Sequence, residues 1–77
     1  MSPATKQVAS IEPEYCMLAH NIRRLREARM SQQELADIVG LRPTYISHIE
    51  RGIRRPMLHH IMHIARALNC SLLELVN

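Results

Sequence analysis

Four polar side chains in the middle of the chain recur at the spacing of a single helix face. They are Thr44, Ser47, His48 and Arg51, at positions i, i+3, i+4 and i+7. The apolar residues of the same segment, Ile46 and Ile49, fall on a different face. Hydroxyl, imidazole and guanidinium groups hydrogen-bond to base edges, and the DNA major groove admits one α-helix. The pattern therefore favours a helix that is held from behind and reads DNA in the major groove.

A sharp corner before this segment predicts how the helix is held. Gly40 ends the preceding helical pattern, because glycine adopts a positive φ at no steric cost. Ala36 is small enough for two helices to cross closely, and Ile46 and Ile49 provide apolar anchors after the corner. Together these residues predict a helix-turn-helix. The alternative is an ordinary helical bundle with no role in nucleic-acid binding.

The rest of the chain predicts further helices joined by short connections. Apolar residues recur at helical spacing, and no segment alternates as a strand does. The expected helices span about residues 13–28, 32–39, 42–51, 57–68 and 72–76. Capping-box sequences at residues 31–34 and 71–74 mark two helix starts, and Asn69 is expected as a left-handed stop. We therefore expect an all-α domain at residues 12–77, after a flexible tail at residues 1–11.

Composition narrows the class of protein. The chain has 77 residues, a net charge of +3 and a pI of about 9.4, and arginine outnumbers Asp and Glu between residues 23 and 55. This surplus suits phosphate contacts, although an ordinary solvated surface has the same composition. No apolar run is long enough to cross a membrane and no signal-peptide core is present, so we expect a soluble cytoplasmic protein. Cys16 and Cys70 are expected as reduced, buried thiols, with a disulfide as the alternative.

Residues 22–76 resemble the Cro/C1-type (XRE) helix-turn-helix family. The matching pieces are IRRLR at 22–26, SQQELA at 31–36, ISHIERG at 46–52, Pro56, and the tail piece 68–76. The resemblance implies a five-helix, lambda-repressor-like DNA-binding domain. Within the family, residues 44–47 and 49–52 look most like the controller proteins of restriction-modification systems. These are small homodimers that bind operators upstream of their own gene and of the endonuclease gene.

Two features depart from the controller pattern. Pro43 stands where controllers commonly have Arg immediately before the Thr44-Tyr45 pair, and Arg42 lies one place earlier. The link at residues 28–30 is one residue shorter than usual and lacks the usual glycine. The first departure implies a different operator, or a regulator outside the controller subgroup.

Candidate DNA contacts lie on both helices of the motif. Gln32 and Gln33 start the first helix, where side-chain amides and free backbone N–H groups hold a phosphate. Thr44 and Ser47 are expected to face the groove, where the methyl group of Thr44 suits a thymine methyl. His48 is a candidate donor to a base acceptor or to a phosphate.

Arginines and one tyrosine complete the expected contacts. Arg42 and Arg51 are candidates for guanine or phosphate contacts, whereas Arg54 and Arg55 on the following loop are expected to contact phosphates. Tyr45 has two possible roles. Its hydroxyl reaches a phosphate while its ring lies against Pro43, or its half-buried ring packs on the helix at 57–68.

The resemblance also implies a structural ion pair. An acidic residue on a DNA-facing helix repels phosphate, so Glu50 is expected to point inward. In the family this Glu pairs with an Arg of the first helix, and Arg26 is the matching residue. The pair is expected to hold the second helix of the motif against the first helix of the domain.

The C-terminal segment is expected to form a homodimer surface. The expected contacts are Leu72, Leu73 and Val76, because these residues and Leu75 cannot all face the core on so short a helix and surplus apolar surface needs a partner. Two-fold pairing matches a palindromic operator in double-stranded DNA, with half-sites about 34 Å apart or a multiple of that. The edge of the helix at 57–68 is expected to contribute.

Other functions have less support in the sequence. His59 and His63 lie four residues apart beside His60, but a zinc site needs further ligands, so no metal is expected. No nucleophile–base pair or phosphate loop indicates an enzyme, a cofactor or a small-molecule ligand. The alternatives left open are another XRE-type repressor, an antitoxin-like protein-interaction module, and a metal- or thiol-responsive sensor.

Overall fold

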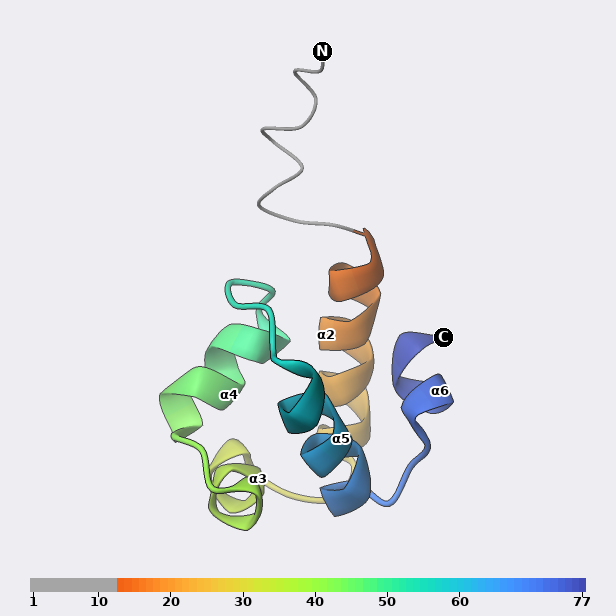
Figure 1. Cartoon of the computed structure of the whole chain (residues 1–77). Helices are drawn as coiled ribbons and strands as arrows, with labels where there is room; N and C mark the ends of the chain where they lie inside the picture. The colour runs from red at the N-terminus through yellow and green to blue at the C-terminus, as the bar shows by residue number, and fades with distance from the viewer. Residues whose placement is uncertain (1–12) are drawn as a thin grey trace.

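The computed structural model describes residues 13–77 as an arrangement of helices with no strand among them (Figure 1). The helices are α2 (Pro13–Glu27), α3 (Gln32–Val39), α4 (Pro43–Glu50), α5 (Leu58–Ala67) and α6 (Leu72–Val76). Every helix that the sequence predicts is present, with both ends within one residue of the expected position. The all-α prediction is therefore confirmed. The predicted tail at residues 1–11 lies outside the described residues.

All five helices share one apolar core. The largest fully buried side chains are Ile22, Leu35, Ile46, Ile49, Ile64, Leu68 and Leu75. Burying one such side chain stabilises the fold by roughly 1.5–3 kcal/mol. Helix α2 packs on α4 and α6, and α3 packs on α4 and α5. In Figure 1, α4 and α6 lie on opposite sides of α2.

Left-handed residues end three of the helices. Gly40, Gly52 and Asn69 have φ values of 73°, 76° and 54°. Two backbone amides beyond α4 donate to the carbonyl of His48, at 2.9 Å and 3.2 Å, and the amide of Cys70 donates to the carbonyl of Ala65 at 3.0 Å. These bonds satisfy the last carbonyls of the helices. The prediction that Asn69 is a left-handed stop is confirmed.

Both predicted capping boxes are present. The hydroxyl of Ser31 accepts from the amide of Glu34 at 3.0 Å, and the Glu34 carboxylate accepts from the amide of Ser31 at 2.8 Å. Ser71 and Glu74 make the same pair of bonds at 3.1 and 2.7 Å. Each box provides hydrogen-bond acceptors for backbone N–H groups that have no partner inside the helix. The bonds span only four residues, so the local sequence determines where α3 and α6 begin.

A buried side chain joins the C-terminal helix to α2. The side-chain amide of Asn21 donates to the carbonyl of Leu75 at 2.9 Å, and both residues are buried. This carbonyl is in the last turn of α6, where no later backbone amide of the helix reaches it. Asn21 therefore fixes a short helix that has little stability of its own.

The cysteines correct one expectation. Both are free thiols, but Cys16 is exposed and only Cys70 is partly buried. Cys16 precedes the buried Leu18 by two residues and therefore lies on another side of α2. The prediction that both thiols are buried is wrong for Cys16. Among the described helices, none is both long enough and apolar enough to cross a membrane.

Candidate DNA-binding surface

The corner between α3 and α4 has the geometry that the sequence predicts. The backbone amides of Gly40 and Leu41 both donate to the carbonyl of Ala36. Ala36 and Ile46 are fully buried, so the two helices cross closely. Arg42 is extended at φ −82° and ψ 145°, and α4 begins at the next residue. The apolar face of α4 therefore points into the core and leaves its polar face outside.

The exposed side of α4 forms one wall of a shallow, open groove. The residues that line the groove are Gly40, Leu41, Arg42, Thr44, Tyr45, His48 and Arg54. The groove thus brings together Arg42, Thr44, Tyr45, His48 and Arg54, which the sequence marks as DNA contacts. Ser47 and Arg51 do not line it. Arg51 is exposed at the C-terminal cap of α4, and Ser47 is partly buried.

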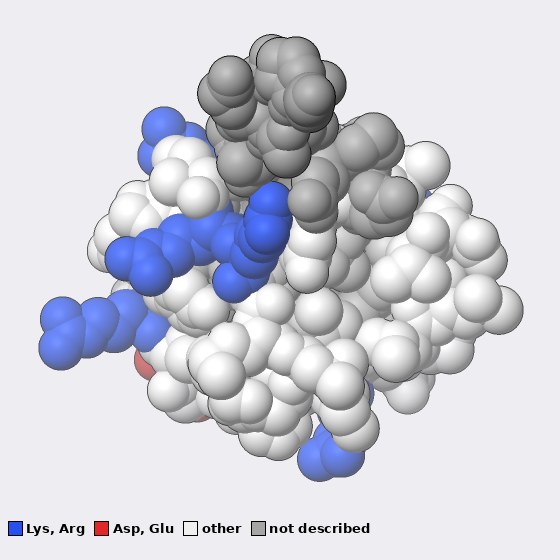
Figure 2. Space-filling view, turned by 45° about the horizontal axis from the view of Figure 1, so that its top comes forward, with Lys and Arg blue, Asp and Glu red and all other residues white. Residues whose placement is uncertain are grey.

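Several basic side chains gather beside α4 on the face shown in Figure 2. In Figure 2 most of the blue Lys and Arg side chains on the visible face lie to the left, where Figure 1 shows α4. Very little acidic surface is visible beside them. A local excess of positive charge attracts the phosphate backbone of DNA.

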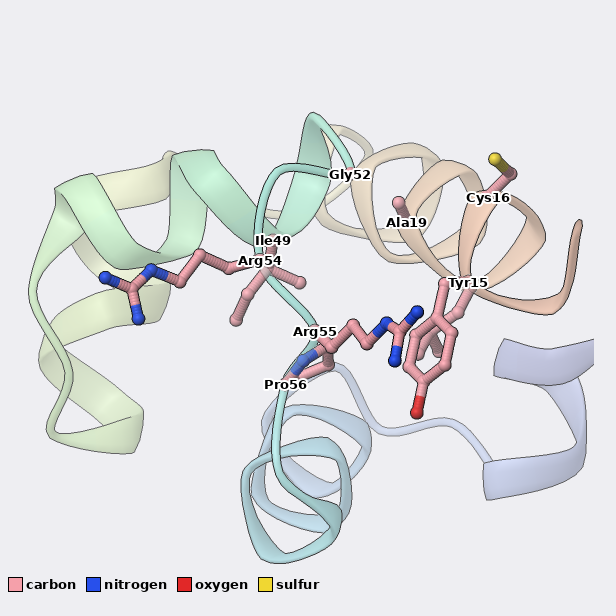
Figure 3. Close-up of a pocket in the computed structure, with 9 residues that line it drawn as sticks. Tyr15, Cys16, Ala19, Ile49, Gly52, Arg54, Arg55 and Pro56 are labelled. Atoms are coloured by element: carbon pink, nitrogen blue, oxygen red, sulfur yellow. The ribbon is translucent and has the colours of Figure 1, made fainter. Parts of the chain in front are cut away.

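The two arginines of the loop after α4 point in different directions. Arg54 extends toward α4, and Arg55 extends toward Tyr15 of α2 (Figure 3). The Cζ atom of Arg55 lies 5.1 Å from the centroid of the Tyr15 ring, within the range of a cation–π contact. Arg54 therefore lines the groove. Arg55 instead contacts α2 through Tyr15. The sequence predicted phosphate contacts for both arginines and gave no role to Tyr15.

Arg26 and Glu50 form the ion pair that the family resemblance implies. The Nε and Nη2 atoms of Arg26 donate to the two Glu50 carboxylate oxygens at 2.6 and 3.0 Å. Both side chains are buried, and Arg26 also donates to the carbonyl of Met30 at 3.0 Å. The pair fixes the end of α4 against α2 and keeps the Glu50 charge away from the groove.

The two glutamines at the start of α3 are already engaged within the domain. Gln32 donates to Glu50 at 3.1 Å and is partly buried, and Gln33 donates to Asp37 at 3.1 Å. The sequence predicted that both glutamines contact phosphates. A carboxamide has two N–H donors, so each glutamine retains a second N–H after making this bond.

Tyr45 packs on α5 through His60. The two rings meet edge to face, with centroids 5.5 Å apart and planes at 75°. The Tyr45 hydroxyl lies 3.4 Å from Nδ1 of His60. The sequence left two roles open for Tyr45, and the structure shows its ring packed on α5. The same side chain also lines the groove.

The histidines of α5 lie close together on one helix. The ring centroid of His59 is 4.1 Å from that of His60 and 6.0 Å from that of His63. Burial lowers the pKa of His60, and the neighbouring His59 and His63 lower it further. Within residues 13–77, no three His, Cys, Asp or Glu side chains gather as metal ligands would.

Helix α6 presents an apolar outer face. Leu75 fills the core, whereas Leu72, Leu73 and Val76 are exposed, Leu73 to 64%. Sequence alone did not mark Asn21, which holds this helix in place. A signal was available, because Asn21 follows the buried Leu18 by three residues and so lies on the inner face of α2.

Comparisons with known proteins agree with this geometry. A family model described as helix-turn-helix matches residues 22–75. Control protein C.SmaI of Serratia marcescens is 41% identical over 61 residues, which cover 78% of this chain and 73% of that protein. Control protein C.BamHI of Bacillus amyloliquefaciens is 43% identical over 54 residues, which cover 70% of this chain and 67% of that protein.

A solved structure is similar over most of the fold. The restriction-modification controller protein C.AhdI from Aeromonas hydrophila superimposes with a TM-score of 0.77 at 34% sequence identity. The alignment covers 83% of this chain and 98% of that chain. This chain therefore belongs to the XRE-type helix-turn-helix family of DNA-binding transcription regulators and is closely related to restriction-modification controller proteins.

Proposed function

We propose that this protein is the controller of a restriction-modification system and binds a palindromic operator as a homodimer. The groove beside α4 is the observation that carries the proposal, because it combines arginine with hydroxyl and imidazole groups on an exposed helix face. In this proposal α4 enters the major groove of each half-site. The protein acts by binding DNA, without chemistry of its own and without a cofactor.

The side chains of α4 divide into readers of bases and contacts to the backbone. Thr44 and Ser47 lie toward base edges, and the Thr44 methyl group meets a thymine methyl. Arg42 and Arg51, at the two ends of α4, reach guanine or phosphate. His48 donates to a base acceptor or to a phosphate from the groove wall.

Phosphate contacts come from both sides of α4. Gln32 and Gln33 use their remaining N–H groups at the start of α3. Arg54 reaches the backbone from the groove, and Arg55 does so from its position beside Tyr15. These contacts set the register of the helix and carry no sequence information.

The exposed face of α6 supports the proposed homodimer. Leu72, Leu73 and Val76 are exposed, and the Asn21–Leu75 bond holds the helix that carries them. Apolar surface of this kind favours association. Because α6 and α4 lie on opposite sides of α2, pairing through α6 leaves both α4 helices open to DNA (Figure 1).

The relatives support the controller role over the other candidates. C.SmaI and C.BamHI are named as control proteins, and C.AhdI as a restriction-modification controller. By analogy, this protein binds upstream of its own gene and of an endonuclease gene. An antitoxin-like module or another XRE-type repressor uses the same fold, so the target DNA distinguishes them.

A gel-shift experiment tests the proposal. The probe is the DNA upstream of this gene, and the control is the same fragment with one half of each inverted repeat scrambled. We expect a dimer complex on the intact repeat that the control fragment does not compete away. Specific binding only at promoters unrelated to restriction and modification genes would identify another XRE-type repressor. Binding without any sequence preference would contradict the proposal.

A further inference from the structure

One side-chain contact links the DNA-facing helix to α5. Tyr45 of α4 and His60 in the first turn of α5 meet through their rings and through the 3.4 Å approach of hydroxyl to Nδ1. Both residues are partly buried, and Tyr45 also lines the groove. Helices α4 and α5 each pack on α3. The Tyr45–His60 contact therefore connects two helices that both pack on the same third helix.

The proton on His60 decides what Tyr45 offers to a ligand in the groove. A phenol has one proton. Neutral His60 has one ring proton; when that proton is on Nε2, the bare Nδ1 accepts a hydrogen bond from the phenol, and Tyr45 presents only lone pairs to the groove. When His60 is charged, both ring nitrogens carry protons, so Nδ1 donates to the Tyr45 oxygen instead and the phenolic proton becomes available. Phosphate oxygens of DNA accept hydrogen bonds and cannot donate them, so they favour the second arrangement, in which the Tyr45 hydroxyl donates to DNA and His60 keeps its hydrogen bond to Tyr45.

The surroundings of His60 favour its neutral form in the absence of DNA. Burial, His59 and His63 all lower its pKa. On α4, His48 lines the groove with Tyr45, and Arg54 joins them from the loop. These neighbours are neutral or positive.

The other helices that pack on α5 contribute little charge near His60. On α3, Ile38 and Val39 face α5 beside His63 and Arg66. On α6, the acidic Glu74 interacts with Ser71, Arg24 and Arg29. A DNA phosphate at the groove is therefore a strong new influence on His60, and it favours the charged form of a nearby imidazole.

Resting on the DNA-binding role proposed above, we propose that His60, held in its neutral Nε2–H form in the absence of DNA, is a positioning residue for operator binding, which acts through Tyr45 and takes up a proton as the Tyr45 hydroxyl donates to DNA. No covalent bond changes in this step. The proton comes from solvent to the imidazole, and the phenolic hydrogen bond turns from Nδ1 to a DNA acceptor. Because binding raises the proton occupancy of His60, affinity rises as the pH falls, at most about tenfold per pH unit for one proton.

The first test needs no DNA. NMR titration of the imidazole signals of the full chain follows His60 in the wild type and in Tyr45→Phe, which keeps the ring and removes the hydroxyl. We expect the Nδ1 signal and the pKa of His60 to change in the variant, while those of His63 stay the same. Identical His60 titrations in the two proteins would overturn the proposed link.

The second test measures operator affinity from mildly alkaline to mildly acidic pH. Wild type is compared with Tyr45→Phe, His60→Asn, the double variant, and His63→Asn as a control that removes a neighbouring histidine without touching Tyr45. We expect Tyr45→Phe and His60→Asn each to lose the part of the pH dependence that comes from proton uptake by His60. The double variant should lose no more than either single variant. The control should retain this part, displaced to higher pH because His63 no longer lowers the pKa of His60.

The possible failures are distinguishable. Operator binding by Tyr45→Phe with the wild-type pH profile would overturn this inference and leave the proposed function intact. A loss in His63→Asn as large as that in His60→Asn would assign the effect to overall histidine charge and would also overturn it. Absence of specific DNA binding by the wild type at every pH would overturn both proposals.

Discussion

Arg26 on α2 donates to both carboxylate oxygens of Glu50 at the end of α4, at 2.6 and 3.0 Å. Gln32 adds a third bond to the same carboxylate at 3.1 Å. Hydrogen bonds therefore hold one end of α4 against the rest of the domain, and the buried side chains of Ile46 and Ile49 pack in the core along its length. A firmly held helix presents its outer face to DNA without a further cost of ordering.

Breaking this ion pair should strongly destabilise the domain. In Glu50→Gln the Arg26 charge remains buried without a counter-charge, so we expect the free energy of unfolding to fall by about 3–5 kcal/mol. Urea denaturation followed by circular dichroism measures the loss. Arg23→Gln is the matched control, because it breaks the exposed Arg23–Glu27 pair, and it should lose less than about 1 kcal/mol. Equal losses in the two variants would refute the assigned importance of the buried pair.

Removing the Asn21 side chain should loosen α6. Asn21→Ala leaves the buried Leu75 carbonyl without its donor, which costs about 1–3 kcal/mol. We expect hydrogen exchange to accelerate at the amides of α6 more than at those of α3. His20→Ala, an exposed change on the same helix, is the control. Unchanged exchange in α6 after Asn21→Ala would mean that the core contacts alone hold this helix.

A charge on the outer face of α6 should separate the proposed dimer. Leu73→Lys places the charge at an exposed position, so the fold should persist while sedimentation velocity reports monomers. Leu75→Ala on the same helix acts on the core instead, and it should reduce stability by about 2–5 kcal/mol. A dimer that survives Leu73→Lys would place the interface elsewhere.

Salt dependence should separate phosphate contacts from base contacts. We expect operator affinity to fall steeply with salt, and Arg54→Ala to reduce the log–log slope by about one with little change in sequence preference. Arg51→Ala and Thr44→Ala should instead abolish specific binding while the circular-dichroism spectrum stays helical. Retained operator preference in both of these variants would argue against α4 as the reading helix.

The two thiols should differ in their reactivity toward iodoacetamide. Burial and the nearby Glu74 carboxylate raise the pKa of Cys70, and Arg29 opposes them only in part. Less Cys70 is therefore thiolate at a given pH, and thiolate is the reactive form. Exposed Cys16 should be alkylated first, as peptide mass spectrometry of partly labelled protein will report. Faster labelling of Cys70 would contradict the described burial.

The sequence by itself predicted the helices, their caps and the corner at Gly40. Each of these depends on bonds between residues a few positions apart, such as Ser31 with Glu34, or on the backbone freedom of one residue. The apolar residues of the core could be read in the same way, because helical spacing places Ile46 and Ile49 on one face. Local chemistry therefore determined the fold class, and the family resemblance added the partner of Glu50.

The tertiary structure decided which partner each polar side chain meets. Asn21 reaches Leu75 across 54 positions of sequence. Gln32 turns toward Glu50, and Tyr45 meets His60, while adjacent Arg54 and Arg55 point in different directions (Figure 3). Such contacts depend on how the helices pack, and a long side chain reaches alternative partners from one backbone position. Helical periodicity gives the face of a residue but cannot give the residue that lies opposite it.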